Sequence, residues 1–82
     1  MVRVKLLSYL GQEVGVAEAQ VDAPSVGRML AALSARFGKP FDRHAKRCKV
    51  IVNGENVAFL KAGATPLKDG DEVALLPPLA GG

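Results

Sequence analysis

The chemically most distinctive residues of this 82-residue chain are the last two, Gly81 and Gly82. Glycine has no Cβ, so both can follow a channel too narrow for any side chain and bring the terminal carboxylate into it. Pro77 and Pro78 fix φ near −65° and favour an extended backbone at the preceding residue. The six residues 77–82 reach at most roughly 20 Å. We therefore expect them to form an extended tail that enters another protein, although fraying is the common fate of final residues. The six residues of this tail are Pro77, Pro78, Leu79, Ala80, Gly81 and Gly82.

The single cysteine is the next reactive group. Cys48 lies between Arg47 and Lys49, four residues after His44. Positive charge nearby would lower its thiol pKa. One Cys and one His without an acid to orient them are nevertheless weak evidence for nucleophilic catalysis. We expect a packed or incidental cysteine, and one cysteine excludes an internal disulfide.

Potential metal ligands are sparse. His44 is the one histidine, whereas zinc sites take three or four protein ligands. The acidic cluster before the last predicted strand does not have the spacing of a twelve-residue calcium-binding loop, and we interpret it as a turn before a strand. It consists of Asp69, Asp71 and Glu72. We predict no metal site. No glycine-rich phosphate loop occurs either, so ATP should be handled by a partner.

The net charge of +3 is concentrated in one stretch. Residues 36–49 contain six basic side chains and only one acidic one, Asp42. The stretch has no recognisable nucleic-acid-binding motif, so we expect a solvated loop or an acidic protein partner rather than a nucleic acid. The basic residues are Arg36, Lys39, Arg43, Lys46, Arg47 and Lys49.

Composition indicates a single small globular domain. The apolar fraction is 49%, and no apolar run approaches the roughly 20 residues of a membrane span. The first five residues alternate charged and apolar side chains, unlike the apolar core of a signal peptide. We expect a cytoplasmic protein without membrane contact.

The first half of the chain predicts two strands and a helix. Period-two alternation indicates strands over 2–7 and 17–21, joined by a connection at 11–15 that contains two glycines. Ser25 is a suitable helix N-cap. An apolar stripe follows, and Gly38 and Pro40 should end the helix. The stripe consists of Val26, Met29, Leu30, Leu33 and Phe37.

The second half predicts further strands. Residues 39–48 give no clear assignment, but 50–52 form a strand that enters the hairpin dipeptide Asn53-Gly54. The return contains Val57, Phe59 and Leu60, and Ala62 to Pro66 form a loop. Asp69-Gly70 predicts a turn before a last strand over 72–76. This order favours an α+β layer with one helix across a mixed sheet.

The alternation also predicts an apolar patch at the root of the tail. If Val4 and Val73 face the helix, then Leu7 and Leu76 face outward. The first and last strands should be neighbours, so these two leucines would lie together. A contiguous exposed apolar patch indicates a partner-binding site.

Taken together, the motifs resemble a known family. They are the Val52-Asn53-Gly54 turn, the run from Pro66-Leu67 through Asp69-Gly70-Asp71-Glu72-Val73, and the Pro77-Pro78 ending before Gly81-Gly82. The chain resembles the MoaD/ThiS family of ubiquitin-like sulfur carriers, most of all the small subunit of molybdopterin synthase. The resemblance implies a β-grasp domain over 1–76, with about four to five strands and one helix, and a tail over 77–82.

The resemblance also implies a chemistry. An E1-like adenylating enzyme would use ATP to activate the Gly82 carboxylate, which is a poor electrophile when ionised. A persulfide or sulfide source would then replace AMP and leave a thiocarboxylate. The molybdopterin synthase large subunit would accept this sulfur, with Leu7 and Leu76 in the contact surface. The chain would bind no cofactor and would not be catalytic alone.

Three alternatives remain open from the sequence. The chain could carry sulfur for another product such as thiazole or cysteine. It could be a protein modifier joined through Gly82 to a lysine of another protein. It could also be a plain interaction module without tail chemistry. Leu7 and Leu76 replace the phenylalanines common in the family, and the basic stretch matches the family pattern poorly.

Overall fold

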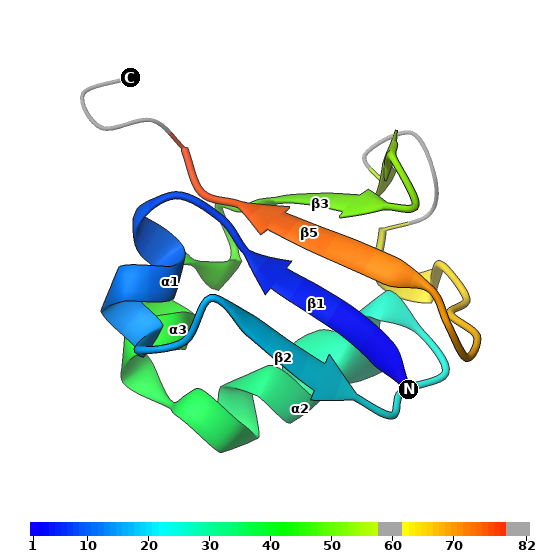
Figure 1. The fold of residues 1–82 in the computed structure, drawn as a ribbon, viewed down its shortest axis with the longest axis horizontal. Helices are drawn as coiled ribbons and strands as arrows, with labels where there is room; N and C mark the ends of the chain where they lie inside the picture. The colour runs from blue at the N-terminus through cyan, green and yellow to red at the C-terminus, as the bar shows by residue number, and fades with distance from the viewer. Residues whose placement is uncertain (58–61, 79–82) are drawn as a thin grey trace.

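The computed structural model describes residues 1–57 and 62–78. A five-stranded mixed sheet has the spatial order β2-β1-β5-β3-β4. Its central strands, β1 (Val2–Leu6) and β5 (Glu72–Leu76), are parallel although they come from opposite ends of the chain. The other neighbours are antiparallel: β2 (Glu18–Val21) beside β1, β3 (Lys49–Val52) beside β5, and β4 (Glu55–Asn56) beside β3. Figure 1 shows this sheet with α2 across one face.

The long helix α2 (Val26–Phe37) supplies the helical side of the core. It begins as predicted, because the Ser25 hydroxyl accepts a hydrogen bond of 3.2 Å from the backbone N–H of Arg28. Gly38 ends it with a φ of 69°. The buried residues of α2 are Val26, Met29 and Leu33, while Leu30 and Phe37 are half-buried. The apolar stripe is therefore confirmed.

Alternate residues of the strands face α2. Val2, Val4 and Leu6 are buried on β1, and Val73 and Leu75 are buried on β5. The Asn53-Gly54 turn is confirmed, with a φ of 48° at Asn53. The return strand β4 ends at Asn56, so Val57 lies beyond it; the predicted Phe59 and Leu60 lie outside the described residues.

One sequence prediction is wrong: residues 11–15 do not form a plain connection, because Tyr9–Val14 form helix α1. The long helix ends before Pro40 as predicted, at Phe37. Of the unassigned residues 39–48, Lys39–Ala45 form a separate helix, α3. Pro40 lies in the first turn of α3, where its missing N–H would have no partner in any case. Both short helices lie at the end of the sheet where β5 finishes (Figure 1).

The architecture is the predicted α+β arrangement, a β-grasp (ubiquitin-like) fold with a mixed sheet and one long helix packed across it. A 3₁₀ turn, η2 (Ala62–Ala64), packs against α2, where the Gly27 Cα hydrogen faces the Gly63 carbonyl. Within the described ranges, no helix is long and apolar enough to cross a membrane.

Candidate functional site

The described part of the tail begins inside the fold. Pro77, directly after β5, is buried, and Pro78 is exposed. The chain therefore emerges at Pro78 rather than at the end of the strand. The predicted roles of Leu79, Ala80, Gly81 and Gly82 fall on residues outside the described ranges.

Tyr9 fixes the direction in which the tail leaves. Its hydroxyl donates a hydrogen bond of 2.7 Å to the backbone carbonyl of Pro78. Tyr9 is the first residue of α1, and the next residue, Leu10, is completely buried. The helix is thus anchored in the core on one side and bound to the tail root on the other.

The chain needs unusual backbone geometry to put Tyr9 there. Ser8 has a φ of 54°, which turns the chain sharply from β1 into α1. At Gly11, a Cβ would lie only 2.9 Å from the carbonyl oxygen of Leu6. Real Cβ atoms do not approach backbone oxygen this closely, so glycine is what allows α1 to pack against the end of β1.

Two further side chains support Tyr9, His44 on α3 and Glu13 on α1. The ring of His44 meets the Tyr9 ring edge to face, with centroids 5.3 Å apart and an interplanar angle of 75°. His44 Nε2 lies 3.2 Å from Glu13 Oε1. A carboxylate only accepts, so the imidazole N–H is the donor. Glu13, His44 and Tyr9 therefore link α1, α3 and the tail root.

The predicted apolar patch lies beside this site. Leu6 pairs with Leu75, and the backbone N–H of Leu7 donates to the Leu75 carbonyl at 3.0 Å. Continuing this register by one residue places Leu7 beside Leu76, and both are half-buried. Ala74 and its cross-strand neighbour Ile51 are also half-buried on the sheet face opposite α2. Sequence reasoning did not single out Ile51. We call Leu7, Ile51, Ala74 and Leu76 the open-face apolar strip.

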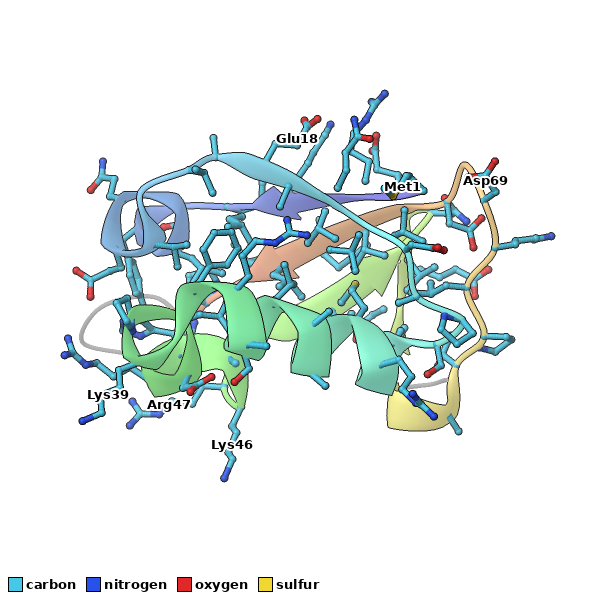
Figure 2. All side chains as sticks on the ribbon, turned by 90° about the horizontal axis from the view of Figure 1, so that it is seen from below. Met1, Glu18, Lys39, Lys46, Arg47 and Asp69 are labelled. Carbon is cyan, nitrogen blue, oxygen red and sulfur yellow. The ribbon has the colours of Figure 1, made fainter. Side chains whose placement is uncertain are left out.

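The other half of the open face is polar. Arg3 lies 3.5 Å from Glu18 and 3.4 Å from Glu72, and Lys5 lies 3.5 Å from Glu72. Figure 2 shows Glu18 on the side of the sheet away from α2. Exposed ion pairs of this kind each stabilise by about 0–1 kcal/mol. The face is thus divided into a charge-paired half and an apolar half next to the tail.

A small cleft surrounds the tail root. Its volume is about 240 Å³. Strand β5 and the two prolines form one side of it, and basic residues around Cys48 form the other. We call it the tail-root cleft; its lining residues are Arg47, Lys49, Leu76, Pro77 and Pro78.

The Cys48 thiol does not have the lowered pKa that its basic neighbours suggested. It is half-buried, and its thiol donates to the His44 carbonyl oxygen at 3.2 Å. Burial raises the pKa of the Cys48 thiol above its ordinary value. The expectation that neighbouring charge lowers this pKa is therefore wrong, and the thiol is protonated at neutral pH.

The acidic segment before β5 forms the predicted turn. The backbone N–H of Lys68 donates to Asp71 Oδ2 at 2.9 Å, and the Asn53 amide donates to Asp71 Oδ1 at 3.1 Å. These hydrogen bonds, the backbone one foremost, lower the pKa of Asp71. Asn53 Oδ1 also accepts from the N–H of Glu72 at 2.9 Å. Across 1–57 and 62–78, no three His, Cys, Asp or Glu side chains gather to hold a metal ion.

Comparison with known proteins identifies the family. The ThiS family matches residues 5–82. A candidate sulfur carrier protein of Archaeoglobus fulgidus is 31% identical over 88 aligned residues, which cover 99% of this chain and 98% of the relative.

Solved structures agree with this match. Small archaeal modifier protein 1 of Methanosarcina acetivorans is similar with a TM-score of 0.81 and 28% identity, over 99% of this chain and 95% of the other. A chain in the BexX/CysO complex of Amycolatopsis orientalis has a TM-score of 0.85 and 25% identity, with complete coverage of both chains. A chain in the complex of subunits 1 and 2 of the molybdopterin-converting factor from Helicobacter pylori 26695 has a TM-score of 0.73 and 25% identity, over 99% and 97%. The protein belongs to the ThiS family.

Proposed function

We propose that this protein is a sulfur carrier whose Gly82 carboxylate is adenylated and then converted to a thiocarboxylate. The observation that carries the proposal is the family match, which extends from residue 5 through the Gly-Gly end. The geometry supports it, because Pro77 and the Tyr9–Pro78 hydrogen bond direct the chain out of the fold immediately before residues 79–82.

The proposed chemistry divides between carrier and partners. An E1-like adenylating enzyme joins the Gly82 carboxylate to AMP from ATP and releases pyrophosphate. Sulfide then attacks the acyl carbon and AMP leaves, which gives the thiocarboxylate directly. If a persulfide R–S–SH attacks instead, AMP leaves an acyl disulfide, and a second thiol of the sulfur donor must then attack the outer sulfur, which releases the thiocarboxylate and forms a disulfide on the donor. The carrier contributes the acyl group and a tail without bulky side chains at its end; ATP is bound by the partner and not by this chain.

The first step gives a direct test. Addition of this protein to an E1-like adenylating enzyme from the same organism should start ATP-dependent exchange of labelled pyrophosphate. The variant lacking Gly81 and Gly82 is the matched control, because it keeps the described fold. Exchange that is equal with both proteins would reject tail chemistry and favour a plain interaction module.

A second candidate function is protein modification. The similarity to small archaeal modifier protein 1 favours it, since that structure matches more closely than the molybdopterin-converting factor in both identity and TM-score. In this function the activated Gly82 acyl group is transferred to a lysine ε-amino group. Lysine conjugates in a lysate that disappear when Gly82 is deleted would support it.

The molybdopterin route is the third destination for the activated tail. The similarity to a chain in the H. pylori complex of subunits 1 and 2 of a molybdopterin-converting factor is the observation in its favour. Thiocarboxylated carrier should then yield molybdopterin when mixed with the synthase large subunit and its pterin precursor. A carrier of a thiazole, cysteine or other pathway should yield none.

A further inference from the structure

The basic stretch of the sequence divides into two parts in the fold. Arg36 makes contacts within the domain: its guanidinium donates a hydrogen bond of 3.2 Å to the Gln20 carbonyl and lies over the Phe37 ring. The remaining basic residues lie on α3, between α3 and β3, and at the first position of β3. Figure 2 shows three of them, Lys39, Lys46 and Arg47, at one end of the molecule and Asp69 at the other.

The cations nearest the tail lack the partners that other cations on this sheet have. Arg3 and Lys5 are paired with Glu18 and Glu72. By contrast, Arg47 and Lys49 have no carboxylate within ion-pair distance among residues 1–57 and 62–78. Both are exposed, and both line the tail-root cleft with Pro77 and Pro78.

The position of these cations relative to the tail limits which surface of a partner enzyme can contact them. Residues 79–82 span at most roughly 14 Å from Pro78. Any enzyme that acts on Gly82 must therefore bring the entrance of its active site within that distance of the tail-root cleft. Two unpaired cations at this entrance attract carboxylates and repel a basic surface.

We infer that the tail-root cleft is a docking site for an acidic protein surface, formed by the adenylating partner beside the entrance to its active site, and that Arg47 and Lys49 make the contact. Lys46 and Arg43 of the α3 region extend the positive field toward an approaching partner. The inference rests on the proposed function, since the partner is the enzyme that receives the tail. The tail-root cleft shares Leu76 with the open-face apolar strip, but its proposed contact with the partner is made by charged side chains rather than by apolar area.

The test compares two double variants with the same change in net charge. Arg47→Glu with Lys49→Glu reverses the charge at the tail root. Arg28→Glu with Lys68→Glu reverses two exposed cations, Arg28 at the start of α2 and Lys68 beside Asp69. Initial rates of pyrophosphate exchange are measured against carrier concentration at several NaCl concentrations, with the same adenylating enzyme as above.

Electrostatic docking gives a defined pattern. Wild-type kcat/KM should fall as salt rises, because exposed charges are screened beyond about 8 Å at physiological ionic strength. The tail-root variant should lose about tenfold or more in kcat/KM at low salt, with kcat at saturation unchanged, and its kcat/KM should not fall as salt rises, because its glutamates repel the acidic surface. The distant variant should stay within about twofold of wild type. The neutral variant, Arg47→Gln with Lys49→Gln, should have a kcat/KM between those of the tail-root variant and the distant variant. It replaces the tail-root variant in the comparison if charge reversal prevents folding.

Other outcomes would overturn the inference. A salt-independent wild-type rate, or equal losses in both double variants, excludes a local acidic contact while leaving the proposed function intact. No exchange with wild type at any salt concentration rejects both. Tight binding of labelled single-stranded RNA at physiological salt, lost in the tail-root variant, would assign the cations to nucleic acid instead.

Discussion

The hydroxyl of Tyr9 donates a hydrogen bond of 2.7 Å to the backbone carbonyl of Pro78, across 69 residues of sequence. It is a direct link between the first helix and the tail root. A proline φ restricts one torsion of the backbone but does not choose the side of the domain on which the tail leaves. The Tyr9 contact makes that choice, and His44 and Glu13 support it.

Tyr9→Phe should separate this positioning role from packing. The ring stays against His44, and only the hydrogen bond to Pro78 is lost. We expect the free energy of unfolding to fall by about 1 kcal/mol. We also expect kcat/KM for adenylation to fall while kcat at saturation changes little, because the tail must be ordered during docking. Denaturant unfolding and pyrophosphate exchange measure the two effects. An unchanged kcat/KM would show that the partner alone orients the tail.

Leu75 and Leu76 are neighbours on β5 with opposite predicted roles. Leu75 is completely buried in the core, and its change to Ala should cost about 2–5 kcal/mol of unfolding free energy. Leu76 is half-buried on the open-face apolar strip, so Leu76→Ala should cost about 1 kcal/mol. Only the Leu76 variant, still folded, should weaken binding to a partner enzyme in calorimetry. Equal binding by wild type and Leu76→Ala would remove this strip from the docking surface.

Gly11→Ala should reverse the usual effect of alanine in a helix. Alanine normally stabilises a helix interior by about 1 kcal/mol relative to glycine. Here its Cβ would lie 2.9 Å from the Leu6 carbonyl oxygen and 3.1 Å from that of Val16. We expect a net loss of about 1–3 kcal/mol and a displaced α1. Gln12→Ala, at the next and exposed position, is the control and should be nearly neutral. A stabilised Gly11→Ala protein would contradict the close packing of α1 on β1.

Asp71 predicts an acid-dependent loss of stability. Its folded pKa lies below the ordinary value because the Lys68 backbone N–H and the Asn53 amide donate to the carboxylate. This contribution is complete above the unfolded pKa of about 3.9 and is lost as pH falls through the folded pKa. Wild type should therefore exceed Asp71→Asn in stability at neutral pH, and the difference should shrink below about pH 4. Urea unfolding across pH, with Asp22→Asn as the exposed control, measures it. A difference independent of pH would contradict the assignment.

The sequence predicted those elements whose residues repeat with a clear period. The alternation on β1 and β5, the stripe of α2 with its Ser25 cap, and the Asn53-Gly54 turn each depend on neighbours in sequence. Helix α1 was missed because it has only six residues with a glycine inside, which gives little helical propensity. Its packing against the core through Leu10 stabilises it instead.

The site was predictable only in part. The outward direction of Leu7 and Leu76 followed from strand alternation. The Tyr9–Pro78 hydrogen bond and the pairing of Glu13 with His44 join residues 69 and 31 positions apart, and no local pattern encodes them. Helix α3 brings His44 to Tyr9, and it could not be assigned from the sequence because its residues are mostly polar and basic.

The most direct test of the central claim is the intact mass of the protein after incubation with the adenylating enzyme, ATP and a sulfide source. We predict replacement of one oxygen by one sulfur, localised by fragmentation to Gly82 and absent when ATP or Gly82 is removed. An unchanged mass, under conditions in which the same enzyme thiocarboxylates its known carrier, would contradict the account.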